Sequence, residues 1–268
     1  MAALDTWIQY MTSTNKRPLH ETQFVVRRGR EDLEEIGMLG PRNNGTQGQA
    51  DVKVYFRDIQ ASLIERIEKY PAVVGCMAWL TDFKIIDALS SHGRHVAIIM
   101  QKEDFLRPDD EGSDWSARIR AAYSKVPCRF WISGMPSDTS LSYHYGKMAV
   151  LAYPENDLWG HVDTFHLSPF RCAGPRKNDQ ETSAVRMHNK FLVFCDIDED
   201  GNYLPAEVWT GSYNASYSAT LSFENVLAIK SDEIARAYLN EFSDIALLSE
   251  PLDWTTVWMR PQYAIGVS

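Results

Sequence analysis

Short apolar runs alternate with amphipathic segments along the middle of this chain, and this alternation restricts the possible fold more than any other feature. Residues 73–80 and 95–100 are apolar runs of strand length. Between them, Ile86 and Leu89 stand at helical spacing, and Gly93 can end the helix. A strand, a helix and a strand in this order predict a β–α–β unit with helices on the sheet faces. The expected fold class is therefore α/β, with a mixed central sheet flanked by helices.

Further elements are indicated on both sides of this unit. Before it, apolar residues recur at helical spacing over residues 55–69, and Pro71 ends that helix. After it come a helix around Ile119 and an apolar run at 128–132, which we expect to be a third strand. Toward the C-terminus we expect strands at 187–194, 206–210 and 224–229, followed by an amphipathic helix with Ser231 as its N-cap.

Two stretches lack this regularity. Residues 1–51 are predicted to be an N-terminal extension with a short strand at 24–28 and a mobile loop after it. Residues 133–183 are rich in proline, glycine, serine, histidine and aspartate, and only 148–152 has the pattern of a strand. The second stretch is therefore expected to be an inserted loop-rich segment, a lid or a rim, within one domain that spans residues 52–268.

The chain is expected to be cytoplasmic and free of membrane association. Its first residues lack the basic and apolar regions of a signal peptide. The purest apolar run, residues 73–80, is far shorter than the roughly 20 residues that cross a bilayer. No Cys-x-x-Cys pair occurs among the four cysteines, which are expected to be reduced, buried thiols: Cys76, Cys128, Cys172 and Cys195.

The charge balance is acidic, with 27 Lys and Arg against 36 Asp and Glu and a formal net charge of −9. A protein that coats duplex nucleic acid is expected to be basic, so this class is disfavoured. The average charge does not exclude a local basic pocket, because only charges within a Debye length of ~8–10 Å act strongly on a phosphate. If the substrate is a nucleic acid, we expect weak, salt-sensitive binding.

A histidine and a lysine open one of the predicted strands. His188 and Lys190 are two residues apart, so a strand directs both side chains to the same face. An imidazole is a nucleophile, and the ammonium beside it is a fixed positive charge. This pair is suited to attack on a phosphate.

Two later segments carry polar groups suited to the same chemistry. Ser212 and Asn214, in the sequence Gly-Ser-Tyr-Asn after an apolar strand, can hydrogen-bond phosphoryl oxygens, and Gly211 lets the backbone approach closely. Glu224 opens the next strand, where its carboxylate is expected to hold the distal ring N–H of His188. Each residue alone has an ordinary explanation, as a core histidine, an edge lysine, a turn or a surface acid. Their occurrence together and in this order favours a catalytic site.

The order H-x-K, G-S-x-N and E-N-V-L-A-I followed by a helix resembles the phospholipase D superfamily, also called the HKD family. The resemblance covers about residues 52–248 and is greatest to the single-motif, nuclease-type branch. It implies a phospholipase D-like fold and phosphodiester chemistry that needs no metal or other cofactor.

The resemblance also implies the role of each site residue. His188 attacks phosphorus and forms a phosphohistidine, Lys190 and Asn214 stabilise the phosphoryl oxygens, Ser212 assists, and Glu224 orients His188. A second histidine then protonates the leaving oxygen. In single-motif members it comes from another subunit, so a homodimer with one composite site is expected.

The sequence departs from the family pattern at one position. The family places an aspartate where this chain has Cys195, and the acid, Asp196, comes one residue later. A shift by one residue sends a strand side chain to the opposite face. We expect a β-bulge that returns Asp196 to the usual place as structural support of the motif; the alternative is that this role is lost.

Three residues of the inserted segment are candidates for a substrate rim. His144 and Lys147 have the spacing H-x-x-K, which puts them on opposite strand faces and disfavours a second catalytic half. Trp159 is the best candidate for stacking on a base, whereas Trp79, Trp131 and Trp209 are expected in the core.

The function that these features favour is a metal-independent phosphodiesterase, an endonuclease that cleaves DNA or RNA through a phosphohistidine. A phospholipase D or phosphatidyltransferase that acts on lipid is the alternative enzyme, although no membrane-attracting amphipathic segment is evident. A nucleic-acid-binding protein that keeps the fold without catalysis is the alternative from another class. The sequence does not distinguish DNA from RNA, strandedness, sequence specificity or pathway.

Overall fold

The computed structural model describes residues 48–91, 95–109, 113–126, 130–133, 150–152, 164–175, 186–199, 203–247 and 249–255. The predicted strand at 24–28 and most of the predicted insertion lie outside these residues.

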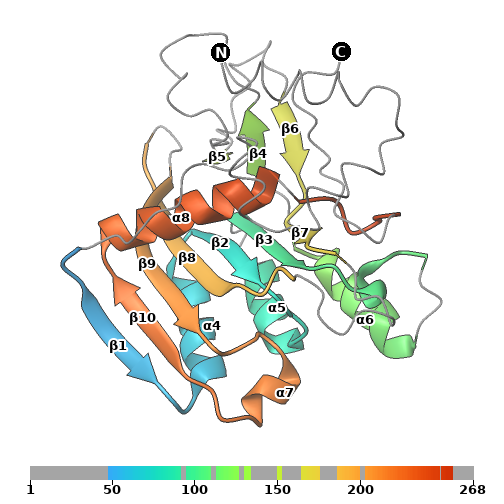
Figure 1. The fold of residues 1–268 in the computed structure, drawn as a ribbon, viewed down its shortest axis with the longest axis horizontal. Coiled ribbons are helices and arrows are strands. Elements are labelled where there is room, and N and C mark those ends of the chain that lie inside the picture. Colours follow the sequence, from blue (N-terminus) through green and yellow to red (C-terminus); the bar gives the residue numbers. More distant parts are fainter. Residues whose placement is uncertain are drawn as a thin grey trace.

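A mixed seven-stranded sheet forms the centre of the molecule (Figure 1). Its strand order is β1-β10-β9-β8-β2-β3-β7. The strands are β1 (Asp51–Tyr55), β2 (Ala72–Met77), β3 (His95–Gln101), β7 (Phe170–Ala173), β8 (Lys190–Ile197), β9 (Tyr203–Gly211) and β10 (Val226–Lys230). The pairs β2–β3 and β3–β7 are parallel, and the other described pairs of this sheet are antiparallel. The predicted β–α–β unit and the mixed sheet are confirmed.

Helices cover both faces of this sheet, as Figure 1 shows. One face packs against α8 (Asp232–Leu247), and the other packs against α4 (Ile59–Lys69), α5 (Phe83–Ser90) and α6 (Asp114–Tyr123). Strand β8 divides its side chains between the two layers, with Leu192 and Phe194 toward α4 and α5 and with Phe191 and Val193 toward α8. Two short helices, η3 (Asp104–Leu106) and α7 (Tyr217–Thr220), follow β3 and β9.

Local signals explain where the first two helices begin. The Asp82 carboxylate caps α5 by accepting the backbone N–H of Lys84 at 2.9 Å. Helix α4 begins at Ile59 rather than at residue 55, because residues 51–55 pair with β10 as a strand. The chain turns between the two elements at Asp58, whose φ is 53°.

The third strand of the parallel part of the sheet is not the predicted one. The run at 128–132 forms β4 (Phe130–Ser133), which pairs with β5 (Val150–Ala152) and β6 (Thr164–Leu167) in a separate three-stranded sheet. The strand beside β3 is β7, inside the stretch predicted to be loop-rich. Its four residues, Phe-Arg-Cys-Ala, are too short for an alternating pattern to show.

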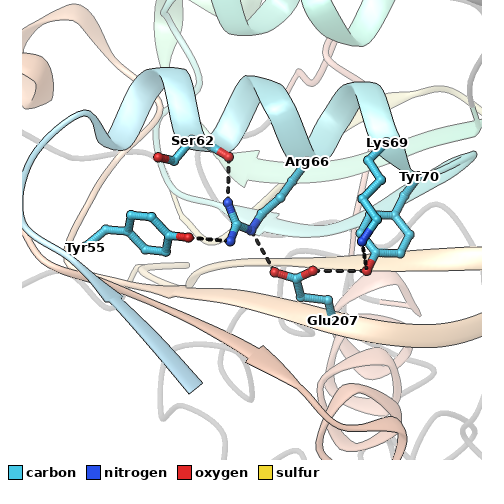
Figure 2. A network of polar contacts seen from close by, with 6 residues as sticks. All are labelled: Tyr55, Ser62, Arg66, Lys69, Tyr70 and Glu207. Atoms are coloured by element: carbon cyan, nitrogen blue, oxygen red, sulfur yellow. Dashed lines mark hydrogen bonds and ion pairs between the residues drawn. The ribbon is translucent and has the colours of Figure 1, made fainter. Parts of the chain in front are cut away.

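A buried ion pair joins α4 to the sheet, as Figure 2 shows. Arg66 Nε donates to Glu207 Oε1 at 2.7 Å, and the two side chains are 10% and 3% exposed. Arg66 also donates to the Tyr55 hydroxyl at 2.7 Å, and Tyr70 donates to the other Glu207 oxygen at 3.0 Å. These contacts fix α4 across β1 and β9, and both Glu207 oxygens accept a hydrogen bond.

Cys76, Cys172 and Cys195 are buried free thiols, as expected, and Cys128 lies outside the described residues. Within the part of the chain that the structure describes, no helix is long and apolar enough to cross a membrane.

Candidate active site

The predicted motif residues meet at the edge of the large sheet that is formed by the ends of its strands, not at an edge strand. Strands β2 and β9 end at this edge, and β8 and β10 begin there, with Met77 opposite Lys190 and Gly211 opposite Val226. The chain after β2 pairs with the loop after β9, since Leu80 forms a β-bridge with Ala215. The segments that carry the motif are therefore held together by backbone hydrogen bonds.

His188 and Lys190 form a direct contact. Lys190 Nζ lies 3.3 Å from Nδ1 and 3.2 Å from Nε2 of His188, and it donates to the His188 carbonyl at 3.1 Å. His188 precedes β8 and is exposed, whereas Lys190 begins the strand and is half-buried. An exposed imidazole thus lies beside a positive charge that the fold holds in place.

The surroundings of this pair favour a neutral imidazole. Partial burial lowers the pKa of His188 below its usual value, and the charges of Lys190 and Arg186 lower it further. Burial also lowers the pKa of Lys190, and the nearby Glu224 carboxylate acts in the opposite direction. The imidazole is therefore deprotonated, and so nucleophilic, to lower pH than a free histidine.

Ser212 and Glu224 bond to each other across β9 and β10. The Ser212 hydroxyl donates to the Glu224 carboxylate and accepts the backbone N–H of Asn225 at 3.0 Å. The expected contact between Glu224 and the His188 ring is not made among the described residues, which corrects that prediction. The reason is register: Glu224 precedes β10 and lies opposite the end of β9, whereas His188 precedes β8.

Asn214 has an unused amide. Its side-chain oxygen is buried and has no hydrogen-bond partner among the described residues. A buried amide oxygen without a partner is unusual, and it marks Asn214 as a polar group that the described contacts do not satisfy.

Gly211 allows a close approach between two strands, a role that the sequence did not suggest. A Cβ at this position would lie 2.1 Å from the Asn225 carbonyl oxygen and 2.8 Å from Val226 Cα. That carbonyl accepts the Ser212 N–H at 3.0 Å. Glycine is therefore needed for the pairing that brings Ser212 to Glu224.

The expected bulge lies on the other strand. Phe194 pairs with Glu207 but Cys195 pairs with Pro205, so the extra residue, Ala206, belongs to β9. Alternation along β8 is unbroken, and Cys195 is buried on the α8 face. Asp196 is exposed and keeps the opposite direction, so the prediction that a bulge returns it to the position of Cys195 is wrong.

Near this edge, the sequence predicted the wrong position for one side chain and did not identify two others. Trp79 was expected in the core but is half-buried, with its ring centroid 5.5 Å from that of His188. Tyr217 and Phe223, between Asn214 and Glu224 in the chain, are 70% and 96% exposed. No sequence pattern marked these two, although large apolar side chains at such exposure are typical of binding surfaces. Trp209 is in the core, as expected.

The proposed rim residues His144, Lys147 and Trp159 lie outside the described residues. Within the residues that the structure does describe, no group of three or more His, Cys, Asp and Glu side chains is arranged to hold a metal ion.

Comparison with known sequences gives two matches. A family model described as the PLD-like domain of cardiolipin synthase matches residues 63–246, a range that includes β8, β9 and β10. The uncharacterized protein L381 of Acanthamoeba polyphaga mimivirus is 32% identical over 208 residues, which are 76% of this chain and 68% of that protein.

Solved structures with a related arrangement of elements share little sequence with this chain. NucT from Helicobacter pylori is 15% identical, with 74% of this chain and 96% of that chain covered and a TM-score of 0.42. Nuc from Salmonella typhimurium, a phospholipase D family member, is 14% identical, with 75% and 97% covered and a TM-score of 0.40. Phosphatidylserine synthase from Haemophilus influenzae is 11% identical, with 84% and 46% covered and a TM-score of 0.40.

Proposed function

The chain belongs to the phospholipase D-like family, and we propose that it is a phosphodiesterase that cleaves nucleic acid through a phosphohistidine at His188. The observation that carries this proposal is the contact of 3.2 Å between Lys190 Nζ and the His188 ring. An exposed imidazole, kept neutral beside a fixed ammonium, is matched to attack on an anionic phosphodiester.

The reaction has two displacements. A His188 ring nitrogen bonds to phosphorus, the bond from phosphorus to the leaving oxygen breaks, and that oxygen takes a proton from a general acid. Water then attacks the phosphorus of the phosphohistidine and gives a proton to the same group, which now acts as a base; the P–N bond breaks, and the imidazole and the protonated acid are both regenerated. Lys190 and the Asn214 amide stabilise the phosphoryl oxygens, where negative charge develops. Ser212 and Glu224, bonded to each other, support the edge at which Asn214 lies.

The general acid is proposed to be His188 of a second subunit. His95 is the other histidine whose side chain the structure describes, and it bonds to the Tyr203 hydroxyl at 2.9 Å. It begins β3, at the end of the sheet opposite the site. A homodimer with one composite site would supply the missing proton donor.

The exposed aromatic rings beside the site support nucleic acid as the substrate. Tyr217 and Phe223 lie on the segment that joins Asn214 to Glu224, next to the groups that would bind the phosphate. Flat exposed rings stack on bases of any sequence. A lipid phosphodiester is the alternative substrate, because the neighbouring Leu221 is 74% exposed and offers apolar contact.

A substrate panel in chelator tests the proposal. Single- and double-stranded DNA, RNA and phosphatidylcholine vesicles are incubated with the wild type, with His188→Asn and with His95→Asn as the matched control. We expect nucleic acid cleavage by the wild type and by His95→Asn and none by His188→Asn. Cleavage of the vesicles alone would show that the substrate is a lipid phosphodiester and not a nucleic acid. Equal activity of His188→Asn and the wild type would contradict the role of His188. Specific nucleic acid binding without any cleavage would favour the non-catalytic alternative.

A further inference from the structure

We propose that Trp79 and Glu103 are positioning residues that fix the His188–Lys190 pair; this inference rests on the proposed function. Among the described residues, Glu224 bonds to Ser212 and not to His188, so the orientation of the His188 ring depends on other contacts. The contacts of one indole meet this need.

Trp79 contacts both members of the pair. Its ring meets the His188 ring in a T-shaped arrangement, with centroids 5.5 Å apart and an interplanar angle of 81°. Lys190 Nζ lies 5.7 Å from the centroid of the same indole, within the range of a cation–π contact. The indole therefore restricts the imidazole from one side and attracts the ammonium, so both groups keep their places relative to each other.

Glu103 fixes the indole in turn. Trp79 Nε1 donates to Glu103 Oε1 at 3.1 Å, which sets the rotation of the ring. The acceptor comes from the segment after β3, which the fold holds at two neighbouring points. Gln101 N donates to the Ala78 carbonyl at 3.1 Å, and Lys102 N donates to the Ala173 carbonyl at 3.1 Å.

The segment that carries Glu103 is also anchored by a buried charge. The Lys102 side chain is fully buried, forms an ion pair with Glu250 and lies 4.9 Å from the ring centroid of Trp254. Separating the two charges would leave a buried ammonium unpaired, which is costly, so the pair holds the segment beside Glu103 in place. The Lys102–Glu250 pair thus holds the segment of Glu103, Glu103 holds the Trp79 indole, and the indole packs against the His188 imidazole.

Four variants separate positioning from general structure. Trp79→Leu removes the ring, Trp79→Phe keeps a ring but removes the Nε1 donor, Glu103→Leu removes the acceptor, and Glu103→Gln keeps one. A small misplacement of a reacting group costs up to about 100-fold in rate. We expect kcat to fall by about 10- to 100-fold in Trp79→Leu and less in Trp79→Phe and Glu103→Leu, with KM little changed. Glu103→Gln is expected to be close to wild type.

The control is Tyr203→Phe, which removes a hydroxyl that bonds to His95 at 2.9 Å at the end of the sheet opposite the pair. Its activity is expected to match the wild type. Trp79→Phe and the Glu103 variants keep the experiment decisive if Trp79→Leu does not fold.

NMR of the His188 ring gives a readout that general destabilisation would not move. Ring protons near an indole carry a ring-current shift that depends on the position of the indole, so a variant that keeps the indole reports the geometry. We expect the His188 signals to move in Glu103→Leu, which leaves the Trp79 ring without its acceptor, and to stay in Glu103→Gln. Unchanged His188 signals in Glu103→Leu together with wild-type kcat in Trp79→Leu would overturn the inference. If the wild type cleaves no substrate, the proposed function fails, whereas the NMR shift still decides whether Glu103 fixes the indole relative to His188.

Discussion

At the scale of single residues, the lowered pKa of His188 follows from its surroundings. Two positive charges and partial burial all disfavour its protonated form. The sequence predicted that His188 and Lys190 lie together, because strand alternation is a local rule. It did not predict the partners of Glu224 or the place of Trp79. Those contacts depend on which strands end at the same edge, and such pairings join residues far apart in the chain.

The charge of Arg186 can be tested without touching the reacting groups. Because Arg186 lowers the pKa of His188, Arg186→Gln should raise that pKa toward its usual value of about 6.5. More of the imidazole is then protonated in mild acid, so the acid limb of kcat/KM should move to higher pH. The basic limb should move the same way, because the general acid proposed in the second subunit is the same residue. The pH profile and an NMR titration of His188 measure this. Arg186→Lys keeps the charge and should shift neither limb; an acid limb that moves to lower pH in Arg186→Gln would be evidence against the account.

At the scale of elements, strands and helices with strong periodicity were predicted to within a few residues, and irregular pairings were not. Strand β7 is too short to show a pattern, and the bulge on β9 at Ala206 depends on its partner strand β8. The sequence of β8 alone suggested that the bulge would lie near Asp196. Local pattern thus fixes the type of an element, while its register needs the whole sheet.

Gly211→Ala should damage the site through the sheet. The new Cβ would lie 2.1 Å from the Asn225 carbonyl oxygen, so β9 and β10 must separate where Ser212 meets Glu224. We expect a loss of about 1–3 kcal/mol in the free energy of unfolding and a fall in kcat larger than that of a core variant of equal stability. Urea unfolding and steady-state kinetics measure the two effects. Ser222→Ala, in the loop between α7 and β10, is the control, and full activity of Gly211→Ala would refute this role of the strand pairing.

The Arg66–Glu207 pair provides a test of how α4 is held. Arg66→Met leaves a buried carboxylate without its cation, and we expect a loss of about 3–5 kcal/mol in the free energy of unfolding. Adding Glu207→Gln removes the buried charge and should restore part of the loss. Asp109→Asn, which breaks an exposed pair with Arg107, should leave the unfolding midpoint unchanged. A loss in Arg66→Met no larger than that in Asp109→Asn would show that the pair contributes little.

At the scale of the whole molecule, the acidic net charge affects substrate binding, and the number of histidines at the candidate site affects the expected oligomeric state. The net charge of −9 leaves substrate binding to the local groups around Lys190, so binding is expected to weaken as salt rises. The described part of one subunit offers no second histidine beside His188, which is why the proposal needs two copies.

Mixed dimers test the composite site. If each site needs His188 from both subunits, refolding equal amounts of wild type and His188→Asn together should leave about one quarter of the activity of the same total amount of wild type. Independent subunits would instead keep about half, because each wild-type subunit would act alone. Light scattering on the same samples reports the oligomeric state. A fully active monomer would place the second histidine within the same chain.

The most direct test of the account is to trap the covalent intermediate. Wild-type protein is mixed with a phosphodiester substrate labelled at the scissile phosphate, quenched in base to preserve phosphohistidine, digested and mapped by mass spectrometry. If His188 forms a phosphohistidine, label is expected on the peptide that contains His188 during turnover and is expected to be absent from His188→Asn. Label on a different residue would contradict a phosphohistidine at His188. Turnover by the wild type without any labelled protein, under conditions in which hydrolysis of the intermediate is slow enough for it to be detected, would contradict it as well.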